Sequence, residues 1–220
     1  MSASYSDTTK LRQAIIEACL AMNATGLNQG TSGNISVRFG DQMLITPSGI
    51  DYNKLRPEMM VLMPLNAVEP DPDQMKPSSE WQFHRDILNA KPQVEAVVHA
   101  HPVNCTALAM NRQEIPACHY MVAAFGGSNV PLAEYALFGT RELSEKVVTA
   151  LKDRSACLMA NHGAVVVGDT LQSAMWRMTE LETLAKGYVT SLSIGQPVLL
   201  STDEIEEVKL AFADYGLRTL

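Results

Sequence analysis

Residues 96–101 have the sequence Ala-Val-Val-His-Ala-His, and Pro102 follows them. A short uncharged run that is rich in valine and ends at a proline predicts a buried strand, with a helix able to begin at the proline. Side chains two residues apart on a strand point to the same face, so His99 and His101 can reach a single ion. The alternative is a pair of core histidines with ordinary hydrogen-bond partners.

A second pair of apolar runs lies further along the chain, at residues 156–160 and 164–167. We predict two strands here, joined by a tight turn at Asn161-His162-Gly163. A lone histidine in such a turn is more often structural. Three neutral imidazoles that leave one coordination position open, however, suit a catalytic Zn²⁺, so His99, His101 and His162 form a candidate ligand set.

The remaining hydrophobic patterns alternate between helix and strand. Apolar residues recur every three or four positions over residues 11–22 and again after Thr140 and Thr170, which predicts helices. Alternation over residues 35–39 predicts a half-buried strand. Further helices are expected over residues 78–90 and 203–215, and further strands over residues 43–46 and 61–63. Helices interleaved with strands favour a single layered α/β domain over residues 1–220.

The composition excludes several classes of function. Of the 220 residues, 46% are hydrophobic and 19% are charged, which is enough for a full core, and the formal net charge is −7. An acidic chain is a poor general binder of nucleic acid or of an anionic membrane, although a local site can still take an anionic small molecule. The N-terminal residues carry no apolar run, so we expect neither a signal peptide nor a spanning helix. The four scattered cysteines are expected to be reduced, as in a cytoplasmic protein.

Three polar turns could bind an anion, and their sequences are Gly30-Thr-Ser-Gly-Asn34, Thr46-Pro-Ser-Gly49 and Ser78-Ser-Glu80. The first two can converge backbone N–H groups, and the third precedes a helix, where free N–H groups and the helix dipole attract phosphate. Each turn also has a plainer explanation: an ordinary connection for the first two, and a helix cap for Ser78-Ser79. The first turn has neither the Walker pattern nor the dinucleotide-binding pattern.

The order of these segments resembles the class II aldolase/adducin family over essentially the whole chain. The resemblance rests on Gly-Leu-Asn-Gln-Gly-Thr-Ser-Gly-Asn at residues 26–34, Pro-Ser-Ser-Glu-Trp at 77–81, Val-Val-His-Ala-His at 97–101, Cys-His-Tyr-Met at 118–121 and Phe-Gly-Thr-Arg-Glu-Leu-Ser at 138–144. The sequence looks most similar to members that act on L-fuculose 1-phosphate. It departs from them at Ala100 and Asn161, where they carry an asparagine and a second histidine, and at Ser48, which replaces a threonine.

The resemblance implies a metal centre, a base and a phosphate site. His99, His101 and His162 would hold Zn²⁺, with Mn²⁺ or Co²⁺ as alternatives. Glu80 would ligate the resting metal and act as the general base. The polar turns would hold the substrate phosphate through residues that match Gly33, Asn34, Ser48, Gly49, Ser78 and Ser79.

The resemblance also implies a three-layer α/β/α domain with a central mixed sheet, assembled as a homotetramer with active sites between subunits. Tyr120 of a neighbouring subunit would assist at the aldehyde end, and Phe138, Phe212 and Tyr215 would close over the substrate. Without the resemblance, Tyr120 would be interpreted as a buried aromatic residue. His84 is interpreted as structural.

The implied activity is that of a zinc-dependent aldolase in carbohydrate metabolism. It would reversibly cleave a ketose 1-phosphate to dihydroxyacetone phosphate and an aldehyde. The substrate would be L-fuculose 1-phosphate, in fucose metabolism, or a related 5-deoxy- or 5-methylthioribulose 1-phosphate. A ribulose-5-phosphate 4-epimerase of the same family is the alternative.

Two further alternatives leave part of the pattern unexplained. A zinc hydrolase or hydratase would give Glu80 and the polar turns no role. A non-enzymatic adducin-like module would not need a complete set of metal ligands. No nucleic-acid or membrane partner is expected.

Overall fold

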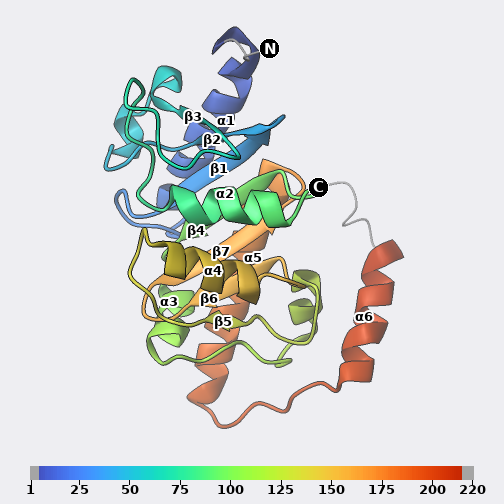
Figure 1. Cartoon of the computed structure of the whole chain (residues 1–220). Coiled ribbons are helices and arrows are strands. Elements are labelled where there is room, and N and C mark those ends of the chain that lie inside the picture. Colours follow the sequence, from blue (N-terminus) through green and yellow to red (C-terminus); the bar gives the residue numbers. More distant parts are fainter. Residues whose placement is uncertain (1–4, 215–220) are drawn as a thin grey trace.

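The computed structural model describes residues 5–214, which form a sheet with helices packed on it (Figure 1). The helices are α1 (Tyr5–Ala24), α2 (Trp81–Ala90), α3 (Val103–Met110), α4 (Arg141–Ala150), α5 (Leu171–Leu192) and α6 (Thr202–Asp214). The strands are β1 (Asn34–Phe39), β2 (Gln42–Ile45), β3 (Val61–Pro64), β4 (Ala96–Ala100), β5 (Leu132–Ala133), β6 (Ala156–Met159) and β7 (Gly163–Gly168). Short 3-10 helices are η1 (Tyr52–Lys54), η2 (Pro57–Met59) and η3 (Tyr120–Phe125).

Within residues 5–214 the strands form one seven-stranded sheet in the order β3-β2-β1-β4-β7-β6-β5. Neighbouring strands are antiparallel except for β5 and β6, which are parallel, so the sheet is mixed. The central strand β4 lies between β1 and β7, and all of its residues are buried. A strand covered on both faces needs apolar residues on both, which explains why residues 96–100 lack polar alternation.

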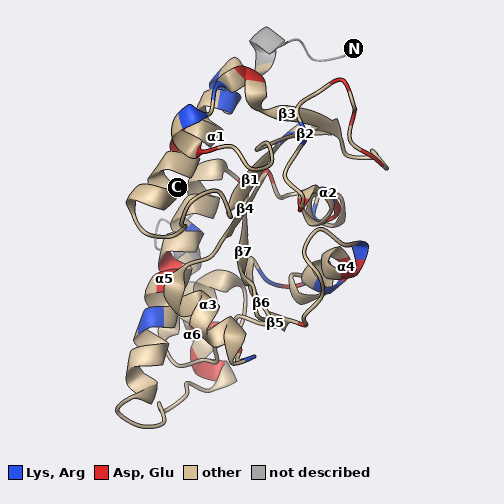
Figure 2. Ribbon diagram, turned by 90° about the vertical axis from the view of Figure 1, so that its left-hand side faces the viewer, with Lys and Arg blue, Asp and Glu red and all other residues tan. Residues whose placement is uncertain are grey.

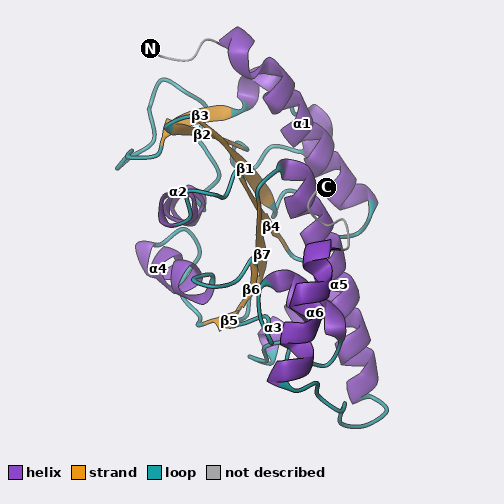
Figure 3. Ribbon diagram, turned by 90° about the vertical axis from the view of Figure 1, so that its right-hand side faces the viewer, coloured by secondary structure: helices purple, strands orange, loops and turns teal. Residues whose placement is uncertain are grey.

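Helices cover both faces of this sheet. Helices α2 and α4 pack on one face and α1, α3 and α5 on the other, while α6 packs against η3 further out (Figure 3). Val165 and Val166, neighbours on β7, belong to two different buried apolar clusters, because successive strand side chains point to opposite faces. Most charged residues lie outside these clusters, on helices and loops (Figure 2). The expected three-layer α/β/α arrangement with a mixed sheet is confirmed.

Most predicted elements are confirmed, with shifts at their ends. The side chains of Thr140 and Thr170 accept hydrogen bonds from backbone N–H groups in the first turns of α4 and α5 and so cap both helices. The strand predicted over residues 96–101 ends one residue earlier, so His101 lies just beyond β4. The end of α6 predicted at Tyr215 lies outside the described residues. In the described part of the chain, no helix has both the length and the apolar character needed to cross a membrane.

Candidate metal centre and active site

Two neighbouring strands bring three histidines together. β4 pairs with β7 so that His99 lies opposite Val165, and His162 lies in the turn immediately before β7. The ring centroids of His99, His101 and His162 are 4.9 to 5.1 Å apart. One ligand nitrogen from each ring lies within 4.8 Å of the other two. The sheet therefore assembles the candidate ligand set from segments about 60 residues apart in the chain.

The backbone of the turn between β6 and β7 sets the position of His162. Asn161 has a φ of 55°, a left-handed conformation that asparagine tolerates better than most residues. A Cβ atom on Gly163 would lie 2.5 Å from Cδ2 of His101 and 2.6 Å from the carbonyl oxygen of Ala100. Only glycine lets β7 and the His101 ring approach this closely. The Asn-His-Gly sequence thus serves both the turn and the placement of two imidazoles.

Hydrogen bonding fixes the tautomer of His99. Its Nδ1 lies 2.9 Å from the carbonyl oxygen of Ala164, which can only accept, so Nδ1 carries the proton. The lone pair of Nε2 therefore faces the cluster, where Nε2 of His101 lies 3.0 Å away. Burial lowers the pKa of His99 to about 3 and that of His162 to about 4, and it also lowers the pKa of His101. The three imidazoles are therefore neutral at pH 7.

Glu80 adds a buried carboxylate to the three imidazoles. It is the N-cap residue of α2 and is 4% exposed. Its Oε2 lies 3.2 Å from Nε2 of His99, and its Oε1 lies 3.3 Å from Nε2 of His162. The first contact is not an ordinary ion pair, because Nε2 of His99 has no proton to share. Oε1 has no hydrogen-bond partner among the described residues.

A divalent cation fits this set of donors. The lone pair on Nε2 of His99 faces the carboxylate of Glu80, and the two repel one another unless a positive charge lies between them. Ligands at roughly 2.0–2.1 Å from a tetrahedral zinc ion stand about 3.3 Å apart. The separations of 3.0, 3.2 and 3.3 Å in this cluster are similar. His99, His101, His162 and Glu80 could therefore hold a metal ion that prefers nitrogen and oxygen ligands.

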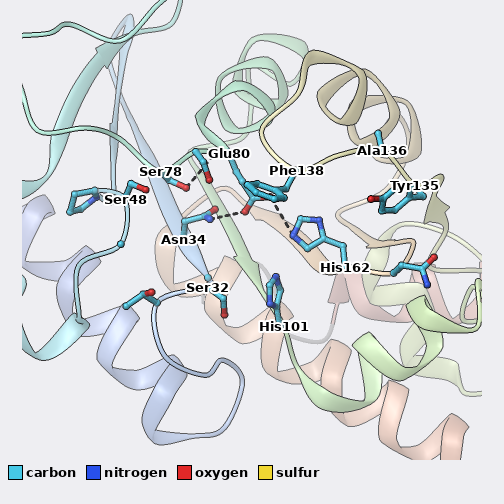
Figure 4. A pocket seen from close by; sticks show the side chains of 16 residues that line it. Ser32, Asn34, Ser48, Ser78, Glu80, His101, Tyr135, Ala136, Phe138 and His162 are labelled. Atoms are coloured by element: carbon cyan, nitrogen blue, oxygen red, sulfur yellow. Dashed lines mark hydrogen bonds and ion pairs between the residues drawn. The ribbon is translucent and has the colours of Figure 1, made fainter.

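A pocket of about 470 Å³ opens beside the cluster (Figure 4). Its lining includes all six positions at which the resemblance places the substrate phosphate: Gly33, Asn34, Ser48, Gly49, Ser78 and Ser79. Figure 4 shows Ser48 and Ser78 on one side of Glu80, with His101 and His162 on the other. The structure therefore joins the polar turns and the imidazoles of His101 and His162 in a single cavity.

Backbone hydrogen bonds tie the second polar turn to the third. The N–H of Ser48 donates to the carbonyl of Lys76 and the N–H of Ser78 donates to that of Thr46, both at 2.9 Å. The hydroxyl of Ser78 accepts a hydrogen bond from the N–H of Glu80 at 3.3 Å. Because Glu80, and not a serine, is the N-cap of α2, the serine pair is not a regular helix cap.

The first polar turn is held against β4. A Cβ atom on Gly33 would lie 2.8 Å from the carbonyl oxygen of His99 and 2.9 Å from Oδ1 of Asn28, so this close approach requires glycine. The buried hydroxyl of Tyr52 donates to the carbonyl of Gly33 at 2.5 Å. The turn is thus positioned by contacts with both the metal-side strand and η1.

The rest of the pocket lining is more apolar. It consists of Tyr135, Ala136 and Phe138, together with Asn161. In Figure 4, Tyr135 and Ala136 lie across the imidazoles from Ser48. Phe138 therefore lies at the pocket, as expected from the resemblance. Tyr135 is absent from the sequence-based candidates, because it lies in a short irregular stretch between β5 and the motif at residues 138–144 that has no periodic pattern.

Tyr120 and Phe212 do not line this pocket. Tyr120 lies in η3 and is 48% exposed, so it is not the buried aromatic residue that would be expected without the resemblance. Its ring centroid lies 6.2 Å from that of Phe212 on α6 and 4.6 Å from that of His119. The structure therefore groups Tyr120 with Phe212 but separates both from the pocket of their own chain. Tyr215 lies outside the described residues.

Comparisons with known proteins identify relatives over nearly the whole chain. The family model described as the class II aldolase and adducin N-terminal domain matches residues 13–189. The L-fuculose phosphate aldolase of Escherichia coli strain K12 is 48% identical over 213 residues, which cover 96% of this chain and 98% of that protein. A 5-methylthioribulose-1-phosphate/5-deoxyribulose-1-phosphate aldolase of Rhodospirillum rubrum is 46% identical over 206 residues, covering 94% and 92%.

A solved structure of an L-fuculose 1-phosphate aldolase has the same fold. It matches with a TM-score of 0.88 at 35% identity, covering 97% of this chain and 98% of that one. Class II aldolases are metal-dependent, and the imidazole cluster could bind a metal. The family model matches most of the chain, and proteins named as aldolases share nearly half of its residues. The chain therefore belongs to the class II aldolase and adducin family, as one of its aldolases.

Proposed function

We propose that the chain reversibly cleaves a ketose 1-phosphate to dihydroxyacetone phosphate and an aldehyde. The observation that carries the proposal is the buried carboxylate of Glu80, which lies beside three neutral imidazoles and beside the polar turns. The reaction requires a base, a Lewis acid and an anion site within reach of one small substrate. Two relatives are named as aldolases of L-fuculose phosphate and of 5-methylthioribulose 1-phosphate or 5-deoxyribulose 1-phosphate, and these names support a ketose phosphate as the substrate.

The polar turns would orient the substrate through its phosphate. Because the hydroxyl of Ser78 already accepts a hydrogen bond from the N–H of Glu80, its own proton is available for a phosphate oxygen. Ser48 and Ser79 add further hydroxyls, and Gly33 and Gly49 allow close approach of the backbone. An anchored phosphate holds the reacting carbon atoms at a fixed distance from Glu80, which lowers the entropic part of the barrier.

Glu80 would act as the general base. Burial raises the pKa of its carboxyl group, although His162 and Asn34 partly oppose that shift. A carboxylate made more basic by desolvation is a better acceptor for the proton of a weak carbon acid. In condensation Glu80 takes the C3 proton of dihydroxyacetone phosphate. In cleavage it returns that proton after the C3–C4 bond has broken.

The metal ion would be Zn²⁺, held by His99, His101 and His162 and, in the resting site, by Glu80; Mn²⁺ or Co²⁺ suit the same nitrogen and oxygen ligands. When bound, such an ion supplies Lewis acidity that stabilises negative charge developing on the ketone oxygen. The protein contributes preorganisation, because the carbonyl of Ala164 already orients the His99 ring.

The aldehyde fragment would be small and mostly apolar. Tyr135 and Ala136 offer apolar surface across the imidazoles from Ser48, Phe138 adds a further apolar ring to the pocket lining, and Asn161 adds a polar group. L-fuculose 1-phosphate and the 5-deoxy- and 5-methylthioribulose 1-phosphates all release aldehydes that end in a methyl or methylthio group. A substrate of this set is therefore proposed, with a role in fucose metabolism if it is L-fuculose 1-phosphate.

The metal-loaded protein is expected to release dihydroxyacetone phosphate from at least one of these three ketose phosphates. The measurement is a coupled assay in which glycerol-3-phosphate dehydrogenase reduces the released triose phosphate and consumes NADH. A ribulose-5-phosphate 4-epimerase would instead interconvert two pentose phosphates without net triose release, and a hydrolase would release inorganic phosphate. Metal-loaded protein that releases no triose phosphate from any of the three contradicts the proposal.

We also propose a homotetramer in which Tyr120 of a neighbouring subunit completes each pocket. The half-exposed ring of Tyr120, outside its own chain's pocket, supports this arrangement. Tyr120 would donate a proton to the aldehyde oxygen, and Phe212 and Tyr215 would help to close the site. The proposal includes one domain over residues 1–220 and a cytoplasmic location, where the four free cysteines stay reduced.

Tyr120→Phe is expected to lower the rate of aldol cleavage by about 100-fold. It should leave exchange of the C3 proton intact, because exchange requires only the dihydroxyacetone phosphate end of the site. Light scattering should give the mass of a tetramer for both proteins. A fully active monomer is incompatible with a shared site.

A further inference from the structure

His84 is completely buried on α2, about one helical turn after Glu80. Its ring stacks on that of Phe83, with centroids 4.6 Å apart. A buried imidazole needs a partner for each ring nitrogen, since an unpaired polar group in the core is costly. Both partners come from β1, where Asn34 and Ser36 are two residues apart and so point to the same face of the sheet.

These residues form a continuous chain of hydrogen bonds that ends at Glu80. Nδ2 of Asn34 donates to Oε2 of Glu80 at 2.9 Å. With the amide oriented in this way, Oδ1 of Asn34 faces Nε2 of His84 at 2.5 Å. On the far side of the ring, Nδ1 of His84 lies 2.7 Å from the hydroxyl of Ser36.

The direction of every bond in this chain is determined by its end at Glu80. An ionised carboxylate can only accept, so Asn34 must present its NH₂ group to Glu80 and its carbonyl oxygen to His84. That oxygen also only accepts, so Nε2 of His84 must carry the proton. Nδ1 then has a lone pair and accepts from the hydroxyl of Ser36. Burial lowers the pKa of His84 well below its ordinary value, with His99 adding to the shift, so the ring stays neutral.

We infer that His84 is a positioning residue for the base: through Asn34 it fixes the orientation of the Glu80 carboxylate. The inference rests on the proposed role of Glu80. Asn34 donates a side-chain hydrogen bond to Oε2 of Glu80, whereas Oε1 has no hydrogen-bond partner among the described residues. An Asn34 side chain free to rotate would release Oε2. His84 prevents that rotation by holding the other end of the amide.

This chain of hydrogen bonds also changes what is expected of Asn34. The resemblance assigns Asn34 to the substrate phosphate, but both ends of its amide are engaged, with Glu80 and with His84. A phosphate contact would depend on the second hydrogen of the same NH₂ group. The main effect of replacing Asn34 should therefore fall on kcat, which depends on the base, more than on KM.

The test compares His84→Leu with His84→Gln. Leucine removes both ring nitrogens, whereas the amide nitrogen of glutamine can keep a donor near the position of Nε2. We expect His84→Leu to lower kcat and the rate of C3 proton exchange by about 10- to 100-fold. KM should change less than about threefold. His84→Gln should recover most of the lost kcat, and the metal content of both variants should equal that of the wild type.

Ile87→Ala is the matched control for destabilisation of the same helix. Ile87 is buried on α2 and belongs to its apolar cluster. This variant should unfold at a lower temperature than the wild type but retain wild-type kcat. If His84→Leu also keeps wild-type kcat, or if His84→Gln recovers nothing, the positioning role is overturned. If the wild type itself exchanges no C3 proton, the proposed function is overturned instead.

A second measurement does not depend on activity. Long-range ¹H–¹⁵N spectra of protein labelled at histidine distinguish the two neutral tautomers from the charged ring, and His84→Gln assigns the signal. The expected species at neutral pH is the neutral ring with the proton on Nε2. A proton on Nδ1 of His84, or a charged His84 ring, would reverse or break the chain of hydrogen bonds and overturn the inference.

Discussion

His99→Ala is expected to lose bound metal and aldolase activity together. The His99 ring is fully buried, and its Nε2 lies 3.0 Å from the His101 ring and 3.2 Å from the Glu80 carboxylate. Alanine leaves two imidazoles where three converge. Removing a group that only hydrogen-bonds a metal ligand costs about 10- to 100-fold in metal affinity or activity. Loss of the ligand nitrogen of His99 itself should therefore lower both metal affinity and activity by more than about 100-fold. Elemental analysis and the triose-release assay measure the two effects.

The design must separate loss of the metal from loss of the fold. His99→Ala also removes the hydrogen bond between Nδ1 and the carbonyl of Ala164, at a cost of about 0.5–1.5 kcal/mol in the free energy of unfolding. His101→Ala tests the same ligand set at a less buried ring and should also lose the metal. His119→Ala replaces an exposed histidine outside the cluster and should keep it. Full metal content with normal turnover in His99→Ala would remove His99 from the ligand set.

The parts of the fold that could be predicted are those where burial leaves a pattern in the sequence. The apolar run at 96–101 predicts β4, and threonines at positions 140 and 170 mark the starts of α4 and α5. Strand β5 has two residues and η3 has six, which is too few for a periodic signal. The order of the strands also depends on pairings between distant segments, such as β1 with β4, that no local pattern specifies.

In the site, too, the features with a local sequence pattern could be predicted, and those that depend on distant segments could not. Two histidines two residues apart on a strand predict a shared target, because the geometry of the strand alone aligns them. From the sequence alone His84 is interpreted as structural, because its hydrogen-bond partners, Asn34 and Ser36, lie 50 and 48 residues away. Its spacing of four residues from Glu80 places the two near each other on one helix face. Tyr135 offered no comparable signal.

Glu80→Gln is expected to abolish exchange of the C3 proton of dihydroxyacetone phosphate while the metal stays bound. Glutamine matches the shape of glutamate, and its amide oxygen can still accept the hydrogen bond from Asn34. It cannot take a proton at neutral pH. General bases contribute about 10²- to 10⁴-fold, so the exchange rate should fall by at least about 100-fold. Proton NMR of dihydroxyacetone phosphate in D₂O follows the exchange directly.

The three imidazoles explain why the metal should remain in Glu80→Gln. They supply three neutral nitrogen ligands, and the variant loses only the carboxylate charge. Glu145→Gln is the control for that loss of charge, because Glu145 is an exposed residue of α4 that pairs with Arg141. It should exchange the C3 proton at the wild-type rate. Unchanged exchange in Glu80→Gln would place the base elsewhere. If Glu80→Gln loses both the metal and exchange of the C3 proton, the carboxylate is essential for holding the ion. Measuring exchange at saturating metal then separates the two roles of Glu80.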